Sequence, residues 1–88
     1  MRIKENFVLR EIAGEYIVTA EGLENINFNK LISLNSSAAF LFKGLSGKEF
    51  EVEDATKMLI EEYQIDETLA MKDSEAICKA WKEIGIVE

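Results

Sequence analysis

Apolar and polar residues alternate with a period of two in the first part of the chain and recur about every 3.6 residues in the rest. Residues 7–12 and 16–20 are rich in strand formers, and Gly14 lies in the short segment between them. The alternation puts Tyr16 and Val18 on the same face of the second segment. This pattern predicts a β-hairpin.

A third strand and a first helix are expected to follow one another without a linker. Residues 24–29 interleave three asparagines with two apolar residues, which predicts an irregular crossing, and the strand follows at residues 30–34. Asn35 is a good N-cap, because its side-chain oxygen can accept from unpaired amides of the first helical turn. The first helix is therefore predicted at residues 36–45, ended by the glycine at 44 or at 47.

Two longer amphipathic helices are predicted in the second half of the chain. Residues 52–63 carry apolar side chains three to four positions apart, with charged side chains between them. Asp66 is the expected N-cap of a last helix that runs to residue 84 and stops at Gly85. One side of this helix is expected to face the core, and it carries Ala70, Ser74, Ile77, Cys78, Trp81 and Ile84.

A flank beside that core-facing side of the last helix has small residues at its middle. It is formed by Leu69, Asp73, Ala76 and Ala80. Small side chains let another backbone come close, so this flank is a candidate groove floor. The alternative is that the alanines are simply good helix formers.

These elements predict an α+β fold with a three-stranded antiparallel sheet followed by a three-helix bundle, in one domain over residues 1–88. A chain of this length buries roughly 60 to 65% of the surface that its unfolded form exposes. Apolar residues make up 48% of the sequence, which is enough for one layer of helices on one sheet.

Composition excludes several classes of function. The net charge of −7 repels a phosphate backbone, so nucleic acid is not an expected partner. With no histidine, a single cysteine and no glycine-rich phosphate loop, we expect no catalytic residues, no metal site and no cofactor. The apolar runs are too short to span a membrane and the first residues are too polar for a signal peptide, so a cytoplasmic protein is expected. Binding to another polypeptide is the class of function that remains.

The order of elements, together with particular residues, resembles the PqqD-like family of peptide recognition elements. The matching residues are FVLR at 7–10 before YIV at 16–18, LN at 34–35 before AFL at 39–41 and Gly47, EEY at 61–63 before ID at 65–66, and then Ala70, Asp73, Ile77, Cys78, Trp81, Gly85 and Ile86. The resemblance covers nearly the whole chain. Each motif consists mostly of core and capping residues, and the order and spacing of the motifs carry the likeness.

The resemblance implies a winged helix-turn-helix-like fold and a non-catalytic peptide chaperone. In this family the leader segment of a ribosomally made precursor peptide adds as an antiparallel strand to the third strand, with its side chains against the third helix. The implied partners are that precursor and a peptide-modifying enzyme, most often a radical S-adenosylmethionine enzyme, with pyrroloquinoline quinone biosynthesis as the best-known pathway. Which precursor and which enzyme are involved stays open.

Two residues depart from the family pattern. Glu51 stands where a Thr or Ser commonly caps the second helix, and Ser74 stands where the third helix commonly has an aliphatic residue. We expect the Ser74 hydroxyl to donate back to the carbonyl of Ala70, so that neither departure disturbs the fold.

The resemblance and the free strand edge together place a candidate peptide-binding site. The residues expected to pair with the peptide are Lys30, Leu31, Ile32, Ser33 and Leu34, and those expected to line the cleft are Leu69, Asp73, Ala76, Ile77 and Ala80. Plain core packing is the alternative for Ile32, Leu34 and Ile77. Asp73 is a candidate to hold a basic or amide group, and the alternative is a solvated carboxylate.

Three other functions remain as alternatives. A DNA-binding winged helix is disfavoured because the last two predicted helices contain no arginine. An acyl carrier protein is suggested by the Asp73-Ser74 pair, but that pair lies inside a helix rather than at its start. Self-association of free strand edges into a homodimer could also coexist with peptide binding.

Overall fold

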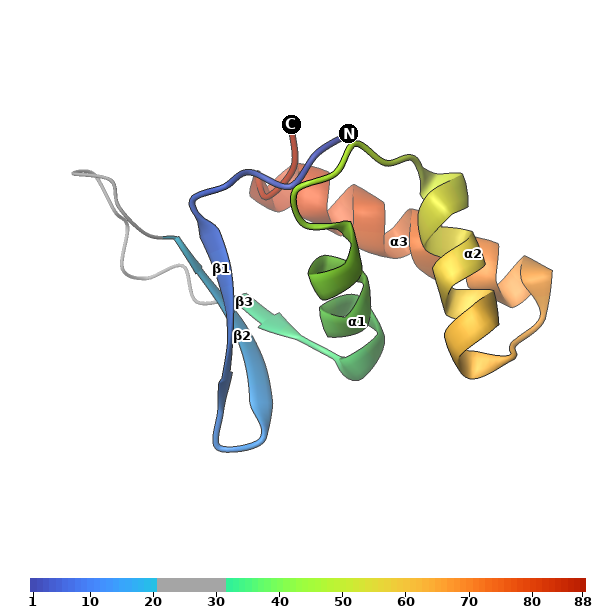
Figure 1. Ribbon diagram of the computed structural model, residues 1–88, viewed down its shortest axis with the longest axis horizontal. Helices are drawn as coiled ribbons and strands as arrows, with labels where there is room; N and C mark the ends of the chain where they lie inside the picture. Colours follow the sequence, from blue (N-terminus) through green and yellow to red (C-terminus); the bar gives the residue numbers. More distant parts are fainter. Residues whose placement is uncertain (21–31) are drawn as a thin grey trace.

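The computed structural model describes residues 1–20 and 32–88. It contains β1 (Phe7–Ile12), β2 (Glu15–Ala20) and β3 (Ile32–Leu34), followed by α1 (Ser36–Leu45), α2 (Val52–Tyr63) and α3 (Glu67–Ile84). The sheet has the order β1-β2-β3 and both pairings are antiparallel. The predicted α+β fold of three strands followed by three helices is confirmed (Figure 1).

The β1–β2 hairpin turns at Ala13 and Gly14, which both have a positive φ, of 53° and 82°. Positive φ at both central residues matches the right-handed twist of the flanking strands and keeps the turn to two residues. The second strand therefore begins at Glu15, one residue before the predicted start. The predicted crossing at residues 24–29 lies outside the described residues.

The centre of the sheet lies over the core. Leu9 on β1 is opposite Val18 on β2, and Val18 is opposite Ile32 on β3. Val18 is fully buried, while Leu9 and Ile32 are partly buried and pack against the same core. Alternation along the strands thus directs one row of apolar side chains toward the helices.

The three helices have the predicted bounds, and α1 and α3 begin at the predicted N-caps. The Asn35 side chain accepts from the amide of Ala38 at 2.8 Å, and the Asp66 side chain accepts from the amide of Thr68 at 3.1 Å. Gly85 ends α3 in the left-handed conformation. At the start of α2, where Glu51 departs from the family pattern, the Asp54 carboxylate accepts from the Glu51 amide at 2.8 Å. This bond satisfies the amide of the N-cap residue and is one part of a capping box.

Two predictions about side chains are wrong. Ile84 was expected in the core and is 39% exposed, because the chain turns at Gly85 and buries Ile86 and Val87 instead. The Ser74 hydroxyl is fully buried but has no hydrogen-bond partner, so the expected bond to the carbonyl of Ala70 does not form.

The two ends of the chain lie side by side along one long side of the molecule, at the top of Figure 1. The amide of Arg2 donates to the carbonyl of Glu88 at 3.1 Å, and the amide of Glu88 donates to the carbonyl of Arg2 at 2.9 Å. Ile3 forms an antiparallel bridge with Val87, and both side chains are buried. No pattern of residues in the sequence predicts this pairing.

Candidate functional site

The first component of the candidate site is the strand β3, which lies at one edge of the sheet. Among residues 1–20 and 32–88, β2 is the strand that pairs with β3, through the register Tyr16 to Leu34, Ile17 to Ser33 and Val18 to Ile32. Alternate residues of an antiparallel strand direct their amide and carbonyl groups to opposite edges, so Ser33 faces one edge while Ile32 and Leu34 face the other. Either way, part of the β3 backbone points away from β2.

The side chains of β3 divide between the core and solvent. Ile32 and Leu34 are partly buried and pack against the core, whereas Ser33 is exposed. The core-packing alternative therefore applies to the side chains of Ile32 and Leu34. The predicted pairing role then rests on the backbone groups of β3 rather than on these side chains. Two of the predicted pairing residues, Lys30 and Leu31, lie outside the described residues.

The second component is the flank of α3 beside its buried face. The buried face consists of Ala70, Ser74, Cys78 and Trp81. Next to it, Leu69 is 47% exposed, Ile77 is half-buried, and Asp73, Ala76 and Ala80 are exposed. All five predicted cleft residues are thus accessible to some degree. The flank is not covered by other described parts of the chain.

This flank of α3 is poor in charge. At 100° per residue, the exposed Ile84 lies on the same flank as the five predicted residues, and Asp73 is the charged side chain among the six. Glu83 and Lys72 border this flank next to Ala76, and the lysines at 79 and 82 lie farther round the helix. An apolar flank with one carboxylate suits apolar side chains together with one basic or amide group.

The core connects the two components. Ile32 and Leu34 from β3 and Ile77 from α3 all pack against the same cluster of buried residues. The exposed residues of the flank, Leu69 among them, do not belong to that cluster. The partly buried residues of the predicted site thus pack on one shared core, and its exposed residues remain accessible to solvent.

A hollow of about 320 Å³, which no sequence pattern predicted, lies at the Leu34 end of β3. It is lined by Gly14, Glu15, Tyr16, Ser33, Leu34, Asn35 and Ser36. Tyr16 also holds the ammonium group of Lys43 from α1, 5.2 Å from its ring centroid, which ties α1 to the hairpin beside the hollow. The hollow could have been found only from the pairing of Tyr16 with Leu34, which the sequence does not specify.

Cys78, the single cysteine of the chain, is buried. Burial raises the pKa of the Cys78 thiol, and the positive charges of Lys82 and the Met1 amino group oppose that rise. A buried, neutral thiol is a poor nucleophile and a poor metal ligand. In the described part of the chain, the carboxylates and the cysteine form no cluster that could hold a metal ion.

No helix among the described residues is both long and apolar enough to cross a membrane.

A comparison with models of protein families identifies the family of this chain. A family model described as coenzyme PQQ synthesis protein D, PqqD, matches residues 16–87. The chain belongs to the PqqD family. The match begins inside the hairpin and extends past the end of α3, so it contains every residue of the candidate site in this PqqD-family protein.

Comparison with solved structures supports the fold. The structure of TbiB1 in complex with the TbiA(beta) leader peptide matches with a TM-score of 0.75 and 16% sequence identity, over 100% of this chain and 95% of that chain. A search of curated proteins finds no significant match.

Proposed function

We propose that this PqqD-family protein is a non-catalytic peptide chaperone that binds the leader segment of a ribosomally made precursor peptide. The leader adds as an antiparallel strand to β3 and lays its side chains on the flank of α3. The observation that supports this proposal is that β3 is an edge strand among the described residues and that it packs on the same core as α3, whose adjoining flank is exposed. The complex of the structural neighbour TbiB1 with a leader peptide supports it.

Backbone pairing alone does not account for useful affinity. A guest strand along the three described residues of β3 makes roughly two to four hydrogen bonds, each contributing about 1 kcal/mol. Association costs at least about 4 kcal/mol. The side chains of the leader must therefore contribute most of the binding energy.

The flank of α3 offers the contacts that the leader side chains need. Leu69, Ile77 and Ile84 present apolar surface, and the alanines at 76 and 80 leave room for a backbone or a large side chain between them. We expect the exposed Asp73 to pair with a basic or amide group of the leader. We expect the leader to be amphipathic, with apolar residues two positions apart facing α3.

The chemical modification of the precursor peptide is then carried out by a partner enzyme. The leader is held by residues 1–88 acting as one peptide-binding domain, and the remainder of the precursor is presented to a peptide-modifying enzyme. In the family this enzyme is most often a radical S-adenosylmethionine protein. A single buried cysteine could not hold its iron-sulfur cluster, so the cluster would be the partner's.

The acyl-carrier alternative is disfavoured by burial. Ser74 has 0% of its surface exposed, and a phosphopantetheinyl transferase could not reach its hydroxyl in the folded protein. The DNA-binding alternative is disfavoured by charge, since α2 and α3 contain no arginine and the net charge is −7.

Proline substitutions in β3 test the proposal. Ser33→Pro and Ile32→Pro each delete one backbone amide, and the two amides point to opposite edges of the strand. The matched controls Ser33→Ala and Ile32→Val keep the amides. The probe is a synthetic leader taken from the short open reading frame beside the gene, and its binding is measured by calorimetry.

The two proline variants should behave differently. The variant whose amide points outward should stay folded and lose leader binding, and the other should loosen the sheet. Both controls should bind as the unchanged protein does. If both proline variants stay folded and bind the leader normally, strand addition to β3 is wrong.

A further inference from the structure

We propose that residues 1–4, the N-terminal strap, fix the end of α3 against the sheet and so set the geometry of the peptide site. This inference rests on the proposed function, because the site that the strap shapes is the one between β3 and α3. The strap residues themselves lie outside that site.

One edge of the strap is paired with the segment that follows α3. The amide of Lys4 donates to the carbonyl of Ile86 at 2.9 Å, and Arg2 and Glu88 exchange two hydrogen bonds of 3.1 and 2.9 Å. Ile3 and Val87 bridge between these bonds and are 4% and 7% exposed. Ile86 directly follows Gly85, the C-cap of α3, so the pairing begins where the helix stops.

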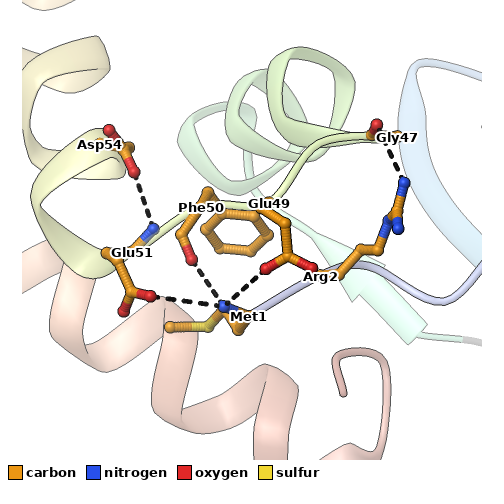
Figure 2. A network of polar contacts seen from close by, with 7 residues as sticks. All are labelled: Met1, Arg2, Gly47, Glu49, Phe50, Glu51 and Asp54. Carbon is orange, nitrogen blue, oxygen red and sulfur yellow. Dashed lines mark hydrogen bonds and ion pairs between the residues drawn. The ribbon is translucent and has the colours of Figure 1, made fainter.

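The other edge of the strap is paired with the connection between α1 and α2. The Met1 amino group donates to the carbonyl of Phe50 at 2.7 Å, and the amide of Phe50 donates to the carbonyl of Met1 at 2.9 Å. The carboxylates of Glu49 and Glu51 each lie 3.8 Å from the same amino group (Figure 2). The strap is thus the middle of three hydrogen-bonded segments.

The strap leads into the sheet within a few residues. The amide of Phe7 donates to the carbonyl of Lys4 at 3.2 Å and closes a tight turn, after which β1 begins at Phe7. β1 pairs with β2, and β2 pairs with β3. A continuous path of backbone hydrogen bonds therefore runs from the end of α3, through the strap, to the sheet.

Side-chain packing and backbone pairing constrain a helix differently. A helix that only packs on a sheet can slide by small shear motions, whereas hydrogen-bonded backbone has a fixed register. The part of α3 nearest the strap carries Ala80 and Ile84 on its exposed flank. The strap accordingly holds this end of the cleft wall in place before the leader arrives, and a preformed site loses less entropy on binding.

Proline and alanine substitutions at the same positions separate the strap backbone from its side chains. The double variant Arg2→Pro, Lys4→Pro removes the two donor amides, and Arg2→Ala, Lys4→Ala removes the same side chains but keeps the amides. The single variant Arg2→Pro is the milder version if the double variant does not fold. Far-ultraviolet circular dichroism establishes that each protein is folded.

Two measurements are made on each variant. The first is the distance distribution between spin labels at Ser33→Cys and Lys79→Cys, in a Cys78→Ala background and without peptide. Ser33 and Lys79 are both exposed, and Lys79 lies away from the cleft flank, so neither label fills the cleft. The second is the dissociation constant of the same synthetic leader.

The proline variant should broaden or shift the distance distribution and raise the dissociation constant on the order of tenfold, while the alanine control changes neither. Distances that match those of the alanine control would overturn the inference, and so would a broadened distribution with unchanged leader affinity. If the unchanged protein binds no leader, the proposed function fails, and the strap is then judged on the distances alone.

Discussion

The rings of Phe42 on α1 and Trp81 on α3 meet edge to face, with centroids 5.9 Å apart and planes at 82°. Both side chains are buried, at 3% and 2% exposure. This contact joins the helix that follows β3 to the helix that carries the cleft flank. It thereby links α1, which directly follows β3, to α3 within the core.

Replacing Phe42 tests how much this contact stabilises the fold. Phe42→Leu should lower the free energy of unfolding by about 1 to 2 kcal/mol, because it removes the aromatic pair and leaves a small cavity. Trp81 is the single tryptophan, so its fluorescence follows urea unfolding directly. The matched variant Phe40→Leu, which loses an edge contact of 5.8 Å to the partly exposed Tyr63, should cost less. Equal losses would contradict this ranking.

Ser74 should be a site where removing a polar group improves stability. Its hydroxyl is fully buried without a partner, so Ser74→Ala is expected to be neutral or to stabilise the protein by up to about 1 kcal/mol. Ser46→Ala is the control, since the Ser46 hydroxyl donates to the carbonyl of Phe42 at 2.6 Å and its loss should destabilise. A clear loss of stability in Ser74→Ala, measured in urea, would mean that the hydroxyl has a partner in solution.

Cys78 should make stability depend on alkaline pH. Burial raises the pKa of its thiol above the ordinary value of 9.0, so the folded state holds this proton more tightly than the unfolded state does. The resulting stabilisation is fully present below the ordinary pKa and is lost as the pH rises through the raised pKa. Urea titrations above pH 9 should therefore show a steeper loss of stability for the unchanged protein than for Cys78→Ala. If the free energy of unfolding falls equally with pH in the unchanged protein and in Cys78→Ala, this prediction is wrong.

Asp73 should select the charge of the bound leader. It is the charged residue on the exposed flank of α3, and Asp73→Lys should weaken a leader that carries a basic residue opposite it by about tenfold, equal to about 1.4 kcal/mol. Glu75→Lys makes the same change of charge on another side of the helix and should alter affinity much less. Anisotropy titrations at low and high salt compare the two, and equal effects would place Asp73 outside the site.

Local signals in the sequence predict the elements well because each signal acts within a few residues. Asn35, Asp66 and Gly85 mark helix ends through bonds to their own neighbours, and the structure has all three where they were expected. The exposure of Ile84 was not predictable in this way, since it depends on Ile86 and Val87 being buried after the turn. A periodic pattern does not reveal which of several nearby apolar residues the core will accept.

The parts of the site that depend on distant segments were harder to foresee. Residues 2–4 pair with residues 86–88 through backbone groups. Because every residue carries such groups, no side-chain pattern predicts the strap. The order of the strands and the exposure of the α3 flank fit the predicted cleft. The pairing and lining roles of its residues remain predictions.

Contacts between the backbone of β3 and the backbone of a bound leader test the central proposal most directly. With labelled protein and an unlabelled synthetic leader, nuclear Overhauser effects report protons that lie within a few ångströms of each other across an interface. The account predicts antiparallel cross-strand effects from the leader to Ser33 and its neighbours, together with side-chain effects to Ala76 and Ala80 on α3. A leader whose contacts lie instead on the outer edge of β1 or on α2, with β3 unaffected, would contradict it.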